Sequence, residues 1–406
     1  MDERHMEEAV LSVVIPAYNE EDGIADIVER VLAIRPALAE VGVGGLELIV
    51  VDDGSADRTA EIVAGYPEVR LVRHGVNQGY GAALKTGFCA AEGELVGFLD
   101  ADGTYPPEHF PALCQEAMRG ADIVVGSRRS GAASEMPAVR RIGNFLWSNL
   151  VTMLSAQRVV DPASGMRVFR REIFDTVCPL PDGLNFTPVM SSRAVHEGLK
   201  LVEIPIPYTE RLGASKLRVV RDGMRFLQTI VWTSLTYNPV RILGGVGLGL
   251  VALAAAIAVT FVVLRLSGVT TLGPWGVAGA FVMVVAAIAG ADLFSLGATF
   301  NYLVSLFHQR PVRQGLFGKP IFKTPLDRQF GWMGLVGIVA GLVLGIVSLV
   351  LGLGGWPVER LWLYLLAGTM LILLGVQLSV FWVIMRVLEE LSQRDALARL
   401  DLEREL

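Results

Sequence analysis

The chain has 406 residues, of which 52% are hydrophobic, and its mean hydropathy is +0.49. It is too apolar for an ordinary soluble protein and too long for one small domain. The net charge of −6 and the pI of about 5.5 give no overall basic field, which argues against a nucleic-acid partner. The three cysteines, Cys89, Cys114 and Cys178, lie far apart without metal-ligand spacing. We expect them to be small core residues in a reducing compartment, with no disulfide framework.

Charged residues are unevenly distributed along the chain. Residues 1–238 have the composition of a globular sequence, whereas charges almost vanish over long stretches from Ile242 onward. This change of composition predicts a soluble domain followed by a membrane domain. The first ten residues are acidic and polar, and they show no signal-peptide pattern.

The first half alternates short apolar runs with helical patterns. We predict strands over Leu11–Ala17, Leu46–Val51, Val69–Val72, Leu95–Leu99, Asp122–Gly126 and Leu201–Tyr208. Strands that alternate with helices indicate an α/β domain with a mostly parallel, doubly wound sheet. Right-handed crossovers would bring the carboxyl ends of these strands to one edge. Pro205 and Pro207 favour an edge position for the last strand.

Polar side chains follow four of the predicted strands. They are Tyr18, Asn19 and Glu20 after the first, Asp52 and Asp53 after the second, Asp100 and Asp102 after the fourth, and Arg128 and Arg129 after the fifth. Asp100 and Asp102 offer two hard oxygen donors, which suit Mg²⁺ or Mn²⁺ shared with a substrate pyrophosphate. Taken alone, Asp102 could instead shape a turn and Asp100 could be a solvated strand end. Four polar strand ends on one edge indicate a site, because α/β proteins bind ligands there.

The segments after the fifth strand are less regular. The earlier glycine-rich turn Asn77–Gly81 does not fit the dinucleotide fingerprint. We predict a helix over Met136–Leu154 with Arg140 and Arg141 near its start, a polar loop over Asp161–Arg167 and a helix over Val189–Gly198. Leu217–Thr236 is predicted to be a basic amphipathic helix on the membrane surface, and the alternative is an ordinary helix packed on the sheet.

The second half contains four predicted spans, each long enough to cross the hydrocarbon core of a bilayer. They are Ile242–Leu264, Gly276–Phe300, Trp332–Leu353 and Leu361–Arg386. The loop His308–Arg328 is rich in Lys and Arg, whereas the outer connections are nearly uncharged. The positive-inside rule therefore predicts an integral membrane protein with the first domain and both termini in the cytoplasm. We expect the membrane to be the plasma membrane of a prokaryote.

These patterns divide the chain into four parts. We expect an α/β domain over residues 1–210, an amphipathic interfacial segment over 211–240, a transmembrane domain over 241–386 and a cytosolic C-terminal helix over 387–406. The last helix could associate into a homo-oligomer or simply end the chain. Asp292 lies inside the second span, where a carboxylate is either functional or packed near the cytoplasmic interface.

An ordered set of motifs carries a family resemblance. VVIPAYNE (13–20), VVDDGSADRT (50–59), NQGYGAALKTG (77–87), FLDADGTYPPE (98–108) and GSR (126–128) resemble the family 2 glycosyltransferases, which have a Rossmann-like GT-A fold. DPASGMR (161–167) and ERLGASK (210–216) resemble the polyprenyl-phosphate sugar transferases of that family. Dolichyl-phosphate mannose synthase and undecaprenyl-phosphate glucose transferase are type members of this group. The resemblance covers about residues 11–240.

The resemblance implies a role for each matching residue. The nucleotide base and ribose would be held by Pro16, Tyr18, Glu20 and Asp53, and the metal and the diphosphate by Asp100 and Asp102. The lipid phosphate would be bound by Arg128 with Arg140 or Arg141, and Ser215 and Lys216 would lie at the acceptor entrance. Two positions depart from the family pattern: Thr104 stands where many members have Gln, and Met166 replaces the Phe of the later motif.

The implied reaction is the inverting, metal-dependent transfer of a hexose to dolichyl or undecaprenyl phosphate, giving a β-linked lipid-phosphate sugar. The donor would be GDP-mannose, UDP-glucose or UDP-N-acetylglucosamine. A phosphate monoester is already mostly ionised at pH 7, because its second pKa is about 6. The acceptor therefore needs positioning by arginines and no dedicated general base.

Two other readings belong to different classes of protein. A processive membrane polysaccharide synthase would carry a Thr-Glu-Asp-like base and a Gln-x-x-Arg-Trp motif. This chain has no Glu-Asp pair near residues 185–200 and no R-x-x-R-W sequence before the spans. A non-catalytic scaffold or flippase would not need an intact Asp100, Asp102 and Arg128. The sequence therefore favours a catalytically competent transferase.

Overall fold

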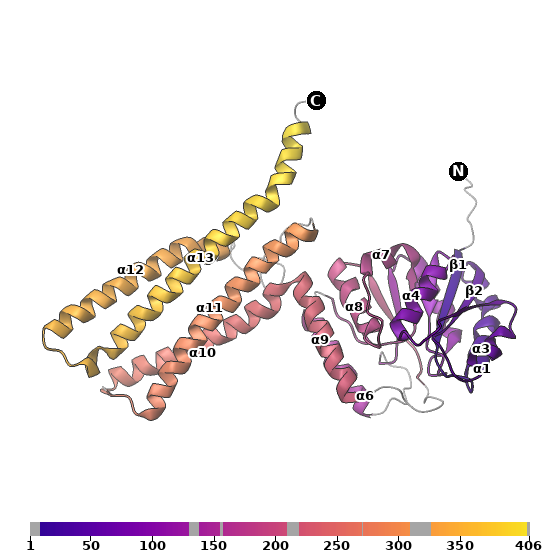
Figure 1. Ribbon diagram of the computed structural model, residues 1–406, viewed down its shortest axis with the longest axis horizontal. Helices are drawn as coiled ribbons and strands as arrows, with labels where there is room; N and C mark the ends of the chain where they lie inside the picture. Colours follow the sequence, from indigo (N-terminus) through magenta and orange to yellow (C-terminus); the bar gives the residue numbers. More distant parts are fainter. Residues whose placement is uncertain are drawn as a thin grey trace. The chain divides into compact units, whose positions relative to one another are not determined.

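The computed structural model describes residues 9–129, 138–154, 157–208, 219–269, 271–308 and 326–403. Contacts within the chain divide it into two compact units, Met1–Ser234 and Leu235–Leu406. The first is an α/β unit and the second is built from long helices (Figure 1). The predicted site residues that the structure describes all lie in the first unit.

A seven-stranded sheet forms the centre of the first unit, with the strand order β3-β2-β1-β4-β6-β5-β7. The strands are β1 (Ala9–Ala17), β2 (Val43–Asp52), β3 (Val69–Arg73), β4 (Leu95–Phe98), β5 (Ile123–Ser127), β6 (Arg167–Arg170) and β7 (Leu201–Pro205). All neighbouring strands are parallel except that β6 runs antiparallel to β4 and β5. The carboxyl ends of β1, β2, β4 and β5 therefore meet at one edge, and β7 lies at the end of the sheet, as its prolines predicted.

The strand β6 is absent from the sequence prediction, which ended a polar loop at Arg167 and named no strand after it. The strand has only four residues, and Gly97 of β4 pairs with Val168 at its centre. Its first three residues are buried on both faces, so they show no alternation that a sequence pattern could reveal. The strand β6 therefore lies between β4 and β5 and runs in the opposite direction to both.

Helices cover both faces of the sheet (Figure 1). One face carries α1 (Ile24–Ala33), α2 (Arg35–Glu40), α3 (Thr59–Ala64) and α5 (Phe110–Met118), and the other carries α4 (Tyr80–Ala90), α7 (Phe174–Val177) and α8 (Phe186–Glu197). Alternate residues of β1 serve the two faces: Leu11, Val13 and Ile15 belong to the core under α1 and α5, whereas Val14 packs against Gly87 of α4. The first unit also contains α6 (Ala138–Leu154), most of α9 (Val219–Tyr237), and the short 3-10 helices Pro107–His109 and Arg171–Ile173.

The second unit contains a short π-helix (Val240–Gly244) and four long helices: α10 (Gly245–Leu266), α11 (Pro274–His308), α12 (Leu326–Leu353) and α13 (Val358–Glu403). Among the described residues, these four helices are long and apolar enough to span a membrane. They correspond to the four predicted spans. The helix α13 continues without a break from the fourth predicted span into the predicted C-terminal helix.

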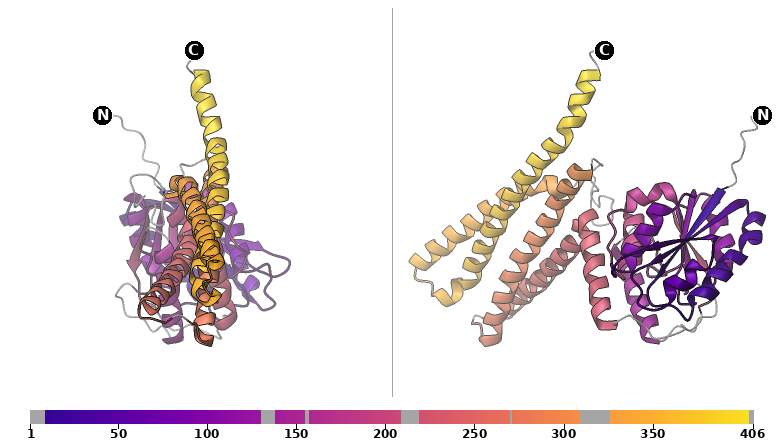
Figure 2. Two further views of the ribbon diagram at one scale, coloured as in Figure 1. Left: turned by 90° about the vertical axis from the view of Figure 1, so that its left-hand side faces the viewer. Right: turned by 45° about the vertical axis from the view of Figure 1, so that its right-hand side comes forward.

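Glycines bring the helices of this unit close together. The helices α12 and α13 run antiparallel (Figures 1 and 2). A Cβ on Gly375 would lie 2.6 Å from the carbonyl oxygen of Gly334, and one on Gly341 would lie 2.6 Å from that of Gly368. Small residues at such contacts let backbones approach within a bilayer. Between α11 and α13, Gln377 Nε2 donates a 2.7 Å hydrogen bond to Asp292 Oδ1. The carboxylate noted in the second span is therefore a polar link between two apolar helices.

Candidate active site

Asp100 and Asp102 follow the buried strand β4 at the carboxyl edge of the sheet, where the sequence predicted them. Leu99 N donates to Val14 O at 3.3 Å, so the chain stays tied to β1 up to the first carboxylate. The turn then closes on Asp102, whose Oδ1 accepts hydrogen bonds from Thr104 N (3.2 Å) and Thr104 Oγ1 (2.6 Å). Thr104, the residue that departs from the family pattern, thus orients Asp102 directly.

Asp100 is held from two sides by residues that the sequence analysis did not select. Tyr80 Oη donates a 2.7 Å hydrogen bond to Asp100 Oδ1. On the other side lies Gly165, where a Cβ would come within 2.7 Å of the carboxylate carbon of Asp100. Burial of the phenol and the neighbouring Asp100 raise the pKa of Tyr80 well above 10, so its hydroxyl remains a neutral donor at physiological pH.

The residues expected to hold the nucleotide lie where the loops after β1 and β2 interlock. Asn19 N donates to Ser55 Oγ (2.9 Å), Ala56 N donates to Asn19 Oδ1 (2.8 Å) and Glu20 N donates to Thr59 Oγ1 (2.9 Å). Pro16 is buried near the end of β1, and Tyr18 is 37% exposed beyond it. The structure thus brings Pro16, Tyr18 and Glu20 beside the loop that carries Asp53.

Asp53 is buried and fixes the glycine-rich turn. Its Oδ1 lies 2.7 Å from His74 Nδ1 and accepts from Gln78 N (2.8 Å), and its Oδ2 accepts from Gly79 N (2.8 Å). His74 Nε2 lies 3.0 Å from Thr86 Oγ1 on α4. The proposed contact of Asp53 with the nucleotide remains a prediction, and in this structure its carboxylate organises the turn that precedes α4.

The amino terminus of α4 is capped by another loop of the protein. Gly81 N and Ala82 N donate to Asp182 O at 2.7 and 3.2 Å, and a Cβ on Gly81 would overlap Pro181 O. Lys85 binds the side chain of Asp182 in the same contact. The glycines therefore make room for the loop before α8, which satisfies N–H groups that an anion could otherwise bind.

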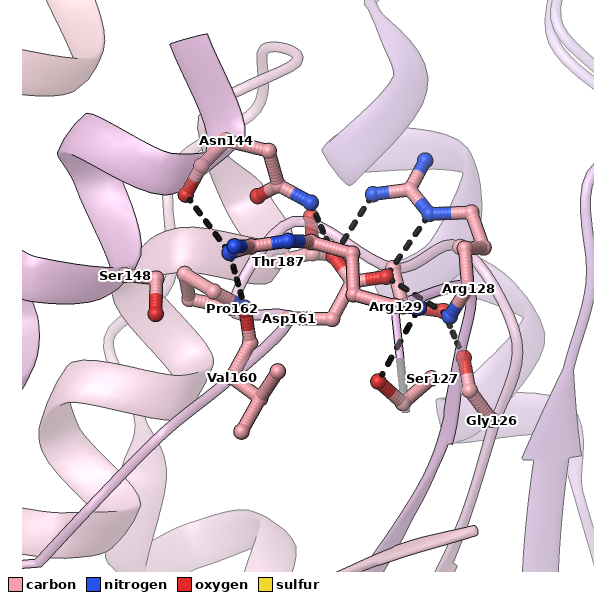
Figure 3. Close-up of polar contacts among 12 residues, drawn as sticks. Gly126, Ser127, Arg128, Arg129, Asn144, Ser148, Val160, Asp161, Pro162 and Thr187 are labelled. Carbon is pink, nitrogen blue, oxygen red and sulfur yellow. Dashed lines mark hydrogen bonds and ion pairs between the residues drawn. The ribbon is translucent and has the colours of Figure 1, made fainter. Parts of the chain in front are cut away.

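Arg128, at the end of β5, forms a buried ion pair (Figure 3). Its Nε donates to Asp161 Oδ2 (2.8 Å) and its Nη2 to Asp161 Oδ1 (2.7 Å). Asn144 of α6 adds a 2.8 Å hydrogen bond to Oδ1. The Asp161 side chain has no exposed surface and that of Arg128 is 12% exposed. The guanidinium also lies 5.8 and 5.5 Å from the ring centroids of Tyr105 and Tyr208.

The charge state of the pair follows from these contacts. Burial disfavours the ionised form of Asp161, but the Arg128 charge and the hydrogen bonds from Arg128 and Asn144 outweigh it and lower the pKa of Asp161. Both groups are therefore charged at neutral pH. Sequence reasoning did not select Asp161 as a site residue. The signal was present as an acidic residue opening the polar segment 161–167, but the partner arginine is 33 residues away.

The segment 161–166 joins the Arg128 end of the edge to the Asp100 end. Ser164 Oγ donates to Gly126 O (2.5 Å), Gly126 N donates to Met166 O (2.9 Å) and Gly165 N donates to Tyr105 Oη (2.7 Å). Met166 is fully buried in the core between the sheet and α1 and α5, so an apolar side chain other than Phe fits there. One short segment thus contacts both predicted halves of the site.

A buried arginine holds this segment against α8. Arg167 Nη2 donates to Pro162 O (2.7 Å) and Thr187 O (3.1 Å), and its Nε donates to Ser164 O (3.2 Å). Burial lowers the pKa of Arg167 to about 10, which still leaves it protonated at neutral pH. Its positive charge therefore lies beneath the carboxyl edge of the sheet.

The remaining predicted lipid-phosphate residues are only partly described. Arg141 is exposed on α6, the helix whose Asn144 contacts Asp161. The side chain of Arg140, and Ser215 and Lys216 altogether, lie outside the described residues. Arg129, the neighbour of Arg128, donates to Val160 O (2.9 Å) and Asn144 O (3.4 Å), which ties α6 to the segment before Asp161 (Figure 3).

The donor set at the strand end fits a hard divalent cation that is completed by substrate. Asp100 and Asp102 supply carboxylate oxygens, and each carboxylate is oriented by a hydroxyl donor. Within the described ranges there is no group of three or more His, Cys, Asp or Glu residues that could hold a metal alone. Mg²⁺ or Mn²⁺ here would take further ligands from a diphosphate and water, which is how Mg²⁺ commonly binds with nucleotides.

Two family models match the chain, and each match lies within one of its two compact units. Residues 12–178 match glycosyl transferase family 2, and residues 239–399 match a domain of unknown function (DUF8752). The chain is 30% identical over 316 residues to undecaprenyl-phosphate 4-deoxy-4-formamido-L-arabinose transferase of Edwardsiella ictaluri, which covers 76% of this chain and 92% of that protein. It is 33% identical over 221 residues to dolichyl-phosphate hexose transferase of Haloferax volcanii, covering 54% of this chain and 92% of that protein.

Among solved structures, glucosyl-3-phosphoglycerate synthase of Mycobacterium tuberculosis, in complex with Mn²⁺, UDP and glucosyl-3-phosphoglycerate, is 24% identical with a TM-score of 0.45. The match covers 56% of this chain and 80% of that one.

The relatives establish the class of protein. The chain belongs to glycosyl transferase family 2 and is a glycosyltransferase. Its catalytic unit has the mostly parallel, GT-A-like sheet expected from the motifs, and four long apolar helices follow it. The family and fold predicted from the sequence are thereby confirmed.

Proposed function

We propose that this chain transfers one sugar from a nucleotide-diphosphate sugar to the phosphate of a polyprenyl lipid. The observation that carries the proposal is the bridge formed by segment 161–166, which contacts Asp100 through Gly165 and Arg128 through Asp161. A carboxylate site for a donor and an arginine suited to a phosphate thus share one edge. The similarity to two polyprenyl-phosphate sugar transferases, over 92% of each, supports the same acceptor.

On the donor side, Asp100 and Asp102 would hold Mg²⁺ or Mn²⁺ and, through it, the diphosphate. The metal would neutralise negative charge that develops on the departing nucleoside diphosphate. The chain's own contribution is orientation, because Tyr80 and Thr104 fix the two carboxylates before substrate arrives. Pro16, Tyr18, Glu20 and Asp53 would contact the nucleotide from the interlocked loops after β1 and β2.

On the acceptor side, Arg128 would bind the lipid phosphate together with Arg140 or Arg141. Asp161 binds Nε and Nη2 of the Arg128 guanidinium. Within the part of the chain that the structure describes, the Nη1 group would thus be left to donate to phosphate oxygens. The ionised phosphate would attack the anomeric carbon without a general base. One in-line displacement inverts that carbon, so an α-linked donor would give a β-linked product.

A lipid acceptor would also account for the presence of a membrane unit in the same chain. A polyprenyl phosphate stays in the bilayer, and four apolar helices would keep the catalytic unit at its surface. The basic residues of loop 308–328 support a cytoplasmic catalytic unit. The membrane would be the plasma membrane of a prokaryote. Ser215 and Lys216, just before α9, would then lie at the acceptor entrance.

The test is the fate of labelled sugar. Membranes that contain the full chain are incubated with labelled GDP-mannose, UDP-glucose, UDP-N-acetylglucosamine or the UDP form of 4-deoxy-4-formamido-L-arabinose, and are then extracted with organic solvent. We expect one of these donors to give label in the lipid fraction. We expect this labelling to depend on added undecaprenyl or dolichyl phosphate. Label in polymer would instead support a processive synthase, and label in neither fraction would support a scaffold. Either result contradicts the proposal.

A further inference from the structure

The hydroxyl of Tyr80 contacts Asp100 from a different segment of the chain. Tyr80 is the first residue of α4, and its Oη lies 2.7 Å from Asp100 Oδ1. It follows Gly79, whose φ of 106° is open to glycine and strained for other residues. The glycine-rich turn therefore delivers one specific side chain to the first of the two carboxylates.

The position of Tyr80 is fixed by backbone contacts on both sides. Before it, Gly79 N donates to the buried carboxylate of Asp53 at 2.8 Å. After it, Gly81 N donates to Asp182 O at 2.7 Å. Because both neighbours are anchored to other loops, the backbone that carries the phenol is fixed next to Asp100.

Asp100 has little freedom on its opposite side. Any side chain at Gly165 would collide with the carboxylate, and Gly165 is itself held by its N–H bond to Tyr105 Oη at 2.7 Å. The carboxylate thus lies between a hydroxyl that binds Oδ1 and a backbone position that leaves room for glycine alone. Asp102 has a corresponding local donor, since Thr104 Oγ1 binds its Oδ1 at 2.6 Å.

We infer that Tyr80 is a positioning residue that orients Asp100 for the divalent cation, as Thr104 does for Asp102. This inference rests on the proposed function, which places the cation at these two carboxylates. Hydrogen bonds to ligating carboxylates fix their orientation, and the loss of such a partner commonly costs 10–100-fold in metal affinity. The neutral phenol donates a hydrogen bond without bringing a positive charge that would compete with the metal.

The test is Mn²⁺ binding by the purified full-length Tyr80→Phe protein in detergent, with UDP or GDP in excess. Free Mn²⁺ is measured by electron paramagnetic resonance, so the readout does not depend on turnover. We expect Mn²⁺ affinity about 10–100-fold weaker than wild type. Transfer activity should then recover when Mn²⁺ is raised by the same factor, with the KM for the nucleotide sugar at saturating Mn²⁺ unchanged.

Tyr66→Phe is the matched control. Tyr66 Oη also donates to a carboxylate, Glu29 Oε1, at 2.9 Å, but this pair is exposed and joins α1 to the segment after α3. The control should bind Mn²⁺ as the wild type does. Thermal unfolding of both variants reports any general loss of stability.

Three results would overturn the inference. Wild-type Mn²⁺ affinity in Tyr80→Phe, with binding lost in Asp102→Ala, would remove Tyr80 from the metal site and leave the proposed function standing. Wild-type affinity in both variants would remove the metal site itself, and the proposed donor site with it. Reduced thermal stability in Tyr80→Phe without weaker Mn²⁺ binding would assign Tyr80 to the fold alone.

Discussion

At the scale of single residues, the pair of Arg128 and Asp161 shows how a buried charge is stabilised by a partner from a distant segment. Each group loses solvation, and each regains it through two hydrogen bonds to the other. Asn144 and the rings of Tyr105 and Tyr208 complete the surroundings. The guanidinium is therefore held in a fixed orientation, which would lower the entropic cost of binding a phosphate if Arg128 has the role proposed for it.

Replacing Asp161 by Asn should strongly destabilise the catalytic unit. The substitution leaves the Arg128 charge buried without a counterion, and breaking a buried pair in this way costs about 3–5 kcal/mol. The measurement is thermal unfolding of the full chain in detergent. Glu68→Gln is the control, because its exposed ion pair with Arg35 should contribute at most about 1 kcal/mol.

The difference in stability between the wild type and Asp161→Asn should depend on pH in a defined direction. The pKa of Asp161 is lowered by folding, so the pair stabilises the fold above the ordinary carboxyl pKa of 3.8. This stabilisation is lost as the pH falls through the lower folded pKa. The gap between wild type and Asp161→Asn should therefore be full near pH 7 and narrow below pH 3.8. A gap that stays constant down to acid unfolding would contradict the ionised pair.

At the scale of elements, backbone contacts between helices determine which glycines matter in the second unit. Gly341 of α12 faces Gly368 of α13, and a Cβ there would also lie 2.6 Å from Ile372 Cγ1. Gly345, one turn further along α12, has no atom within 4 Å of the position of a Cβ. Gly341 and Gly345 therefore provide a packed position and an unpacked control position on the same helix, α12.

Gly341→Ala should lower the thermal unfolding midpoint of the purified protein, because forcing a methyl group into a packed contact costs about 1–3 kcal/mol. Gly345→Ala should leave the midpoint unchanged or raise it slightly, since Ala favours helix over Gly. Equal effects of the two substitutions would show that the α12–α13 contact is not packed as described.

Elements were predictable from the sequence where a pattern is long or regular. The four apolar helices and the parallel strands before Asp102 were found because hydropathy and alternation with helices suffice to identify them. The strand β6 was not found, because four residues carry no period and its antiparallel direction depends on where the polar segment 161–166 is anchored. Helix α8 begins at Phe186, three residues earlier than predicted, because Pro188 is tolerated in its first turn.

At the scale of the whole molecule, the sequence predicted which residues lie at the same edge of the sheet. It predicted few of the hydrogen bonds that these residues make. Motif order predicted that Asp53, Asp100 and Arg128 follow separate strands of one sheet, and the topology confirms this. The hydrogen-bond partners Tyr80, His74 and Asp161 come from distant segments, so no local spacing could identify them. The roles of these residues with substrate remain predictions.

The central claim is that Asp100 and Asp102 serve the transfer of a sugar to a lipid phosphate. The most direct measurement is mass spectrometry of the organic extract after the purified full chain is incubated with a nucleotide sugar, Mn²⁺ and undecaprenyl phosphate. We predict a new lipid with the mass of polyprenyl phosphate plus one sugar residue in the wild type, and none with Asp102→Ala, while both proteins unfold at similar temperatures. The same amount of that lipid from both proteins would contradict the account.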